Sequence, residues 1–135
     1  MARIMVVNHD LELLQLMQEI LASEDHEPVI LRYGEDTFSQ LREAQPDLII
    51  LDIRIDRQAD GWTLCDKLTL HEETAKIPVL VCSTAIHDLQ ERRDWLEKKG
   101  IGVLPKPFDL DDLLSCVSGM LKSGAPCMVG LDRAS

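Results

Sequence analysis

Short apolar runs alternate with longer amphipathic segments along almost the whole chain. The apolar runs are RIMVV (3–7), PVIL (28–31), LIIL (48–51), VLVC (79–82) and IGVL (101–104). Between and after them, apolar side chains recur at helical spacing over 11–23, 35–44, 61–73, 87–99 and 110–121. Strands that alternate with helices pair in parallel through right-handed crossovers. The pattern therefore predicts a doubly wound α/β domain, in which helices cover both faces of a parallel sheet.

Polar side chains follow these predicted strands at the point where each strand ends. Asn8, His9 and Asp10 follow the first strand, Asp52 the third, Ser83 and Thr84 the fourth, and Lys106 the fifth. Taken alone, such residues are usually turn formers, helix caps or solvated charges. In a doubly wound sheet, however, the ligand site lies beyond the carboxyl ends of the strands. A carboxylate, hydroxyl groups and an ammonium group are therefore expected to meet at one edge of the sheet.

The chain resembles the receiver domains of two-component response regulators, a family that includes the stand-alone chemotaxis regulator. The resemblance covers about residues 2–122 and rests on the order and spacing of PDLIILD, the Asp60-Gly61 pair, IPVLVCSTA and GVLPKPF. It implies a flavodoxin-like fold with five strands in the order 2-1-3-4-5, here over a domain of residues 1–122. The remaining residues, 123–135, contain Gly, Pro and Ser without periodicity and are predicted to be a flexible tail or the stub of a linker.

The family resemblance also implies a role for each residue at the strand ends. A sensor histidine kinase or a phosphotransfer protein would donate a phosphoryl group to Asp52, which acts as the nucleophile and forms an acyl phosphate. Lys106 would pair with a phosphoryl oxygen, because the transferring group must be positioned and neutralised. Ser83 is the favoured switch hydroxyl, and Thr84 takes that role in a register one residue later. Such a protein is not a conventional enzyme and at most catalyses its own phosphorylation and dephosphorylation.

The expected magnesium site departs from the family pattern. The family places two acidic residues after the first strand to hold Mg²⁺, and the matching residues here are Asn8 and His9. Mg²⁺ prefers oxygen ligands in an octahedron, so an amide and an imidazole are weak replacements for two carboxylates. Asp10 is either the N-cap of the first helix or a compensating ligand. With Asp52 and the backbone carbonyl of Arg54 as the remaining ligands, we expect weak or impaired Mg²⁺ binding.

Charge and hydrophobicity restrict the expected partners and location. Acidic residues outnumber basic ones 24 to 14, which gives a formal net charge of −10. Nucleic acid is therefore not an expected direct partner, because phosphate binding needs a basic face. The apolar runs are far shorter than a membrane span, and the N-terminus lacks the apolar region of a signal peptide. We expect a cytoplasmic protein that contacts a kinase, a downstream protein target and, as a further option, a second copy of itself.

The four cysteines are Cys65, Cys82, Cys116 and Cys127. They form no C-x-x-C pair and show no regular spacing, and three of them lie in apolar surroundings. We therefore expect reduced thiols rather than disulfides or metal ligands.

Two other functions remain open. One is a phosphorylation-independent interaction module, which the Asn8-His9 pair favours because it lacks the acidic metal ligands. The other is a small flavodoxin-like enzyme or cofactor binder. The chain has no Gly-rich phosphate loop of the G-x-G-x-x-G type, which argues against this second alternative.

Overall fold

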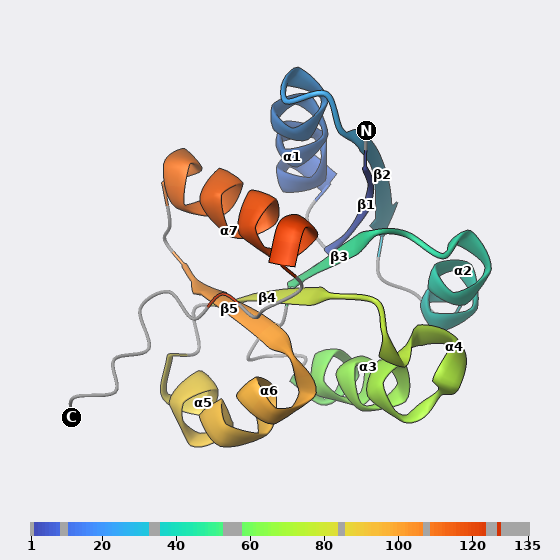
Figure 1. Cartoon of the computed structure of the whole chain (residues 1–135), viewed down its shortest axis with the longest axis vertical. Helices are drawn as coiled ribbons and strands as arrows, with labels where there is room; N and C mark the ends of the chain where they lie inside the picture. The colour runs from blue at the N-terminus through green and yellow to red at the C-terminus, as the bar shows by residue number, and fades with distance from the viewer. Residues whose placement is uncertain are drawn as a thin grey trace.

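The structure is a computed structural model, and it describes residues 2–8, 11–32, 36–52, 58–83, 86–106, 109–123 and 127. Within these residues, five strands form one sheet in the order β2-β1-β3-β4-β5 (Figure 1). The strands are β1 (Arg3–Asn8), β2 (Glu27–Arg32), β3 (Leu48–Asp52), β4 (Val79–Ser83) and β5 (Ile101–Pro105). Every pairing between neighbours is parallel. The predicted fold class and the strand order implied by the resemblance are both confirmed.

Helices cover both faces of this sheet (Figure 1). One face carries α1 (Leu11–Ser23) and α7 (Leu110–Ser123). The other carries α2 (Thr37–Ala44), α3 (Gln58–Leu70), α4 (Glu72–Ala75), α5 (Ile86–Glu91) and α6 (Arg93–Lys99). The buried apolar residues divide into two clusters, one on each face. The sheet is thus the middle layer of three.

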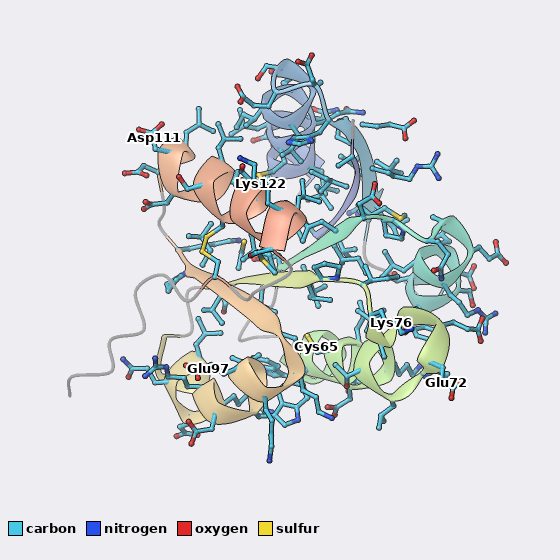
Figure 2. The ribbon with its side chains drawn as sticks, viewed as in Figure 1. Cys65, Glu72, Lys76, Glu97, Asp111 and Lys122 are labelled. Atoms are coloured by element: carbon cyan, nitrogen blue, oxygen red, sulfur yellow. A yellow bond between two sulfur atoms is a disulfide. The ribbon has the colours of Figure 1, made fainter. Side chains whose placement is uncertain are left out.

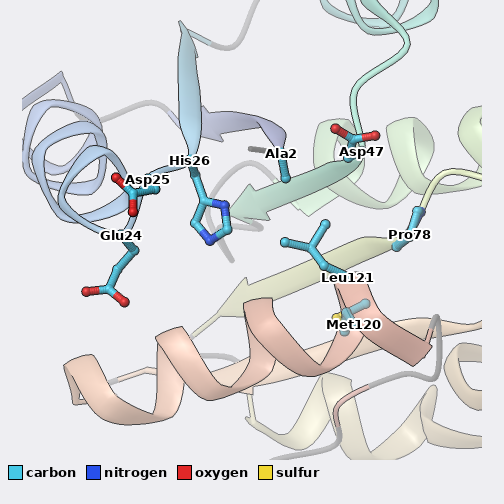
Figure 3. A pocket seen from close by; sticks show the side chains of 8 residues that line it. All are labelled: Ala2, Glu24, Asp25, His26, Asp47, Pro78, Met120 and Leu121. Carbon is cyan, nitrogen blue, oxygen red and sulfur yellow. The ribbon is translucent and has the colours of Figure 1, made fainter.

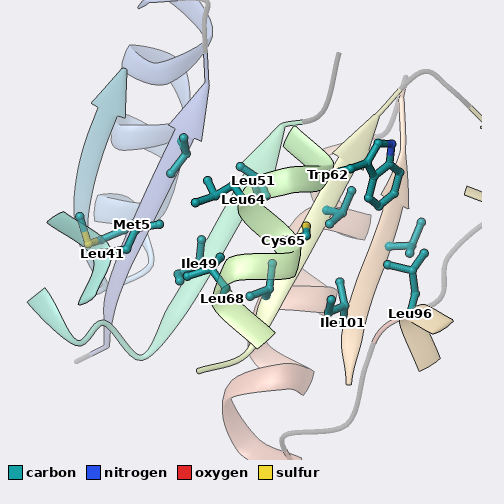
Figure 4. Packing of buried hydrophobic residues seen from close by; sticks show 14 of the residues in the cluster. Met5, Leu41, Ile49, Leu51, Trp62, Leu64, Cys65, Leu68, Leu96 and Ile101 are labelled. Carbon is teal, nitrogen blue, oxygen red and sulfur yellow. The ribbon is translucent and has the colours of Figure 1, made fainter. Parts of the chain in front are cut away.

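The central strand β3 shows why the chain adopts this layered arrangement. All of its residues are buried, and successive side chains point to opposite faces of the sheet. Leu48 and Ile50 belong to the cluster beneath α1 and α7, whereas Ile49 and Leu51 belong to the cluster beneath α3 (Figure 4). Burying each such side chain contributes about 1.5–3 kcal/mol. A continuous apolar run is therefore required of a strand with both faces covered.

Two helices differ from the sequence prediction in their boundaries. The helix predicted for 61–73 begins at Gln58 and ends at Leu70, and the short helix α4 follows it. The helix predicted for 87–99 is divided into α5 and α6 at Arg92, where the backbone has φ −96° and ψ 6°. At this break the Arg92 guanidinium lies over the ring of Trp62, with its carbon 4.3 Å from the ring centroid. A contact between distant segments is therefore present at a boundary that helical periodicity cannot reveal.

The surface of the helices is strongly charged. Glu72, Lys76, Asp111 and Lys122 are exposed, whereas Cys65 is buried in the cluster beneath α3 (Figure 2). Of the helices that the structure describes, none combines the length and the apolar character needed to cross a membrane.

The cysteine prediction is correct for one pair and wrong for the other. Cys65 and Cys82 are buried free thiols. Cys116 and Cys127 form a disulfide, drawn as a yellow bond in Figure 2, with their Cα atoms 5.6 Å apart. The chain returns toward α7 after that helix ends and brings together two cysteines separated by 11 positions. Sequence spacing does not reveal this return, and that is why the disulfide was not predicted.

Candidate functional site

The end of β3 places a carboxylate in the interior of the protein. Asp52 is the last residue of this strand and is 6% exposed. A charge buried to that degree is costly unless it is paired. Lys106 supplies the partner, because its Nζ forms an ion pair with Oδ1 of Asp52. The Lys106 side chain is 22% exposed, so its ammonium group approaches the carboxylate from the rim of the sheet.

Strand pairing brings Ser83 and Lys106 together at the same edge. Ser83 ends β4 and pairs with Pro105 of β5. The next backbone N–H, that of Lys106, donates a hydrogen bond to the Ser83 carbonyl oxygen at 2.8 Å. Ser83 is 1% exposed. Residues from three neighbouring strands therefore bring a carboxylate, a hydroxyl and an ammonium group to one edge, as the sequence predicts.

Asn8 belongs to the same edge of the sheet. It ends β1, and the residue before it, Val7, pairs with Leu51 of β3. The parallel register thus places Asn8 alongside Asp52, and it is buried, with 4% exposure. Its amide oxygen and the Asp52 carboxylate are the type of ligand that Mg²⁺ accepts, so these residues fit a magnesium ion but supply a single charge.

The other predicted site residues, His9, Asp10, Arg54 and Thr84, lie outside the described residues. Within the described part of the chain, no group of three or more His, Cys, Asp or Glu residues is arranged to hold a metal ion.

Cys82 lies beside the site, although the sequence analysis did not include it among the site residues. It pairs with Asp52 across β3 and β4. Burial raises the pKa of its thiol to about 12, the Lys106 cation lowers that pKa, and the Asp52 carboxylate raises it. The signal was its position, one residue before Ser83 at the end of a strand. At neutral pH the thiol is protonated and adds no charge to the site.

A separate cavity lies at the opposite ends of the strands from Asp52 (Figure 3). Its volume is about 540 Å³. Its lining includes the residue directly before each of four strands, namely Ala2, His26, Asp47 and Pro78. Because parallel strands share one direction, this cavity is at the amino ends of the strands, a full strand length from Asp52.

Comparison with known proteins agrees with this geometry. The chain matches the model of the response regulator receiver domain over residues 4–118. It belongs to that family. The receiver domain is 32% identical to the DNA-binding dual master transcriptional regulator RpaA of Synechocystis over 90% of this chain and 50% of RpaA. It is 27% identical to PilH of Pseudomonas aeruginosa over 90% of this chain and 98% of PilH.

Solved structures share the fold of this receiver domain. A putative response regulator from Chloroflexus aurantiacus matches with a TM-score of 0.75 and 24% identity, over 90% of this chain and 98% of the other. The lengths of the relatives differ. The chain spans about half of RpaA and of the transcriptional regulatory protein BaeR of Escherichia coli, but nearly all of PilH.

Proposed function

We propose that this receiver domain accepts a phosphoryl group on Asp52 and passes the signal on through protein contacts. The donor is the phosphohistidine of a sensor histidine kinase or of a phosphotransfer protein. The observation that carries the proposal is the buried ion pair between Asp52 and Lys106 at the carboxyl edge of the sheet. In a member of this family, that pair combines a nucleophile with the cation that a transferring phosphoryl group needs.

The chemistry assigned to Asp52 and Lys106 is a single displacement at phosphorus. An oxygen of the Asp52 carboxylate attacks, an O–P bond forms, the P–N bond to the donor imidazole breaks, and the imidazole leaves. The product is an acyl phosphate with more negative charge than the carboxylate it replaces. Lys106 stays beside this group and compensates part of the charge, as its ion pair with Asp52 already does.

Ser83 is the residue that we assign to sensing the phosphoryl group. Its hydroxyl would bond a phosphoryl oxygen, and its carbonyl oxygen already accepts a hydrogen bond from Lys106 N–H. A movement of Ser83 would therefore also displace the backbone of Lys106, the residue that follows β5. Thr84 is the alternative in a register one residue later.

Receiver domains generally bind Mg²⁺ at the phosphorylation site, where the ion helps to neutralise the phosphoryl group. We assign Asp52, the amide oxygen of Asn8 and the backbone carbonyl of Arg54 to this ion, with His9 and Asp10 as weak contributors. Binding would be weaker than in a receiver with two further carboxylates, because Asn8 is neutral. An opposite charge near a divalent ion contributes a few kcal/mol at an effective dielectric constant of about 20.

The proposed partners are the phosphoryl donor and a downstream protein, and a second copy of the chain is a further candidate. We place the domain at residues 1–122 and the tail at 123–135, with the tail attached to the domain at Cys127 through the disulfide to Cys116, and we place the protein in the cytoplasm. The formal charge of −10 argues against direct contact between this domain and nucleic acid.

Intact mass spectrometry after incubation with acetyl phosphate tests the acceptor assignment. With Mg²⁺ present, the wild-type chain should gain one phosphoryl group, and Asp52→Asn should gain none. Asp66→Asn, which changes an exposed carboxylate on α3, is the matched control and should be labelled like the wild type. Failure of the wild type to gain mass at any Mg²⁺ concentration would favour the phosphorylation-independent interaction module instead.

A further inference from the structure

Strand β5 lies at the edge of the sheet, and its outer side has few backbone donors. The backbone of Lys106 faces β4, since its N–H reaches the Ser83 carbonyl. Backbone groups alternate in direction along a strand, so Ile101, Val103 and Pro105 face outward. Proline has no N–H. The Val103 N–H is therefore the donor in the middle of this outer edge.

Cys127 covers this donor. The Val103 N–H donates a hydrogen bond to the Cys127 carbonyl oxygen. Cys127 also lies directly against Gly102, because a Cβ atom added at Gly102 would be 2.9 Å from the Cys127 nitrogen and 3.1 Å from its oxygen. The third attachment is the disulfide to Cys116 of α7. Cys127, which follows the end of α7, is thus held on the edge of β5 by a covalent bond, a hydrogen bond and close backbone packing.

We propose that the Cys116–Cys127 disulfide is a reversible redox site, whose reduction releases the edge of β5. The reductant is a dithiol. Its first thiolate attacks Sγ of Cys127, the Cys116–Cys127 bond breaks, and Cys116 leaves as a thiolate that takes a proton. The second thiol of the reductant then displaces Cys127 from the mixed disulfide. Two electrons and two protons are transferred, leaving two protein thiols and an oxidised, disulfide-bonded reductant.

The different exposure of the two sulfur-bearing residues supports this order of events. Cys116 is 1% exposed, whereas Cys127 is partly exposed. An external thiolate therefore reaches Cys127 first. The other thiols do not compete, because burial raises the pKa of both Cys65 and Cys82 to about 12 and keeps them protonated. In the cytoplasm, the location proposed above, disulfides are usually transient rather than permanent.

Reduction removes the covalent attachment and leaves the hydrogen bond and the packing against Gly102. The bond closes a loop between positions 11 apart. Opening that loop should raise the fraction of time that Val103 N–H is uncovered by a factor on the order of 100, from chain-closure entropy. The sheet itself should stay intact, because β5 is still paired with β4.

Two measurements on the full chain test the proposal. The first counts thiols by iodoacetamide labelling under denaturing conditions. Two labels are expected for protein kept oxidised, and four after native incubation with dithiothreitol. Four labels without reductant would show that the bond does not form. Two labels after native incubation with dithiothreitol, rising to four only when dithiothreitol is applied in denaturant, would show that it is a fixed structural bond. Either result would overturn the proposal.

The second measurement is amide hydrogen exchange, read at single residues by NMR. Exchange at Val103 should be on the order of 100-fold faster after reduction, while exchange at Ile50 in the central strand should not change. In Cys127→Ser, exchange at Val103 should be as fast as in the reduced protein and should not change when dithiothreitol is added. Equal acceleration at Val103 and Ile50 would indicate global destabilisation, and no acceleration at Val103 would indicate that the disulfide does not hold the edge. Neither readout involves phosphorylation, so this proposal and the acceptor role of Asp52 can fail separately.

Discussion

Replacing Lys106 by methionine removes the cation that pairs with Asp52 and keeps most of the volume of the side chain. Exposed ion pairs contribute up to about 1 kcal/mol, whereas removing one partner of a buried pair costs about 3–5 kcal/mol. Asp52 is 6% exposed and the Lys106 side chain 22% exposed. The pair lies between those limits, so we expect Lys106→Met to lower the free energy of unfolding by about 2 kcal/mol.

Urea unfolding at pH 7, followed by the tryptophan fluorescence of Trp62 and Trp95, which both belong to or pack against the cluster beneath α3, measures this loss. A change of about 2 kcal/mol moves the midpoint by about 1 M when the slope is near 2 kcal/mol per molar urea. A double-mutant cycle with Asp52→Asn should give a coupling energy above about 1 kcal/mol. Lys76→Met, which removes an exposed lysine at the end of α4, is the matched control. Equal midpoints for the Lys106 and Lys76 variants would refute the reasoning, because Lys106 would then be a bystander.

Three further predictions follow from individual residues. Asn8→Asp adds a carboxylate at the site and should tighten Mg²⁺ binding about tenfold in a calorimetric titration; an unchanged isotherm would mean that other groups already hold the ion. Burial raises the pKa of Cys65 and Cys82 from 9.0 to about 12, so stability that is complete below pH 9 should fall by about 1.4 kcal/mol per pH unit for each thiol as the pH rises toward 12. Urea midpoints that stay constant from pH 9 to 10.5 would contradict this. Gly102→Ala in β5 places a methyl 2.8 Å from the sulfur atom of Met120 in α7 and should lower the free energy of unfolding by about 1–3 kcal/mol. Gly119→Ala, in α7 itself, meets nothing within 4 Å and should raise the free energy of unfolding by up to about 1 kcal/mol. Urea midpoints that move in the same direction for both variants would be inconsistent with this packing.

The central features of the site were predictable because they depend on where buried strands end. The apolar runs before Asp52, Ser83 and Lys106 have clear ends in the sequence, and parallel pairing brings those ends to one edge. The structure does bring these three residues together. The extent of Asp52 burial was not predictable, since it depends on how the helices pack around the strand ends.

Contacts between distant segments account for what the sequence did not reveal. The break at Arg92 coincides with a contact to Trp62, thirty positions earlier in the chain. The bond between Cys116 and Cys127 requires the chain to return after α7. Neither contact affects the apolar periodicity, which reports only the face that each segment buries. Periodicity therefore predicted the elements and their order, but not these two tertiary features.

Chemical trapping of the acyl phosphate tests the acceptor role of Asp52 most directly. Borohydride reduces an aspartyl phosphate to homoserine, which peptide mass spectrometry locates at a single position. After treatment of the full chain with acetyl phosphate and Mg²⁺, followed by borohydride, we predict homoserine at position 52 and at no other aspartate. Homoserine at Asp10 or Asp60 instead, or its absence from every peptide, would contradict the assignment of Asp52 as the phosphoryl acceptor.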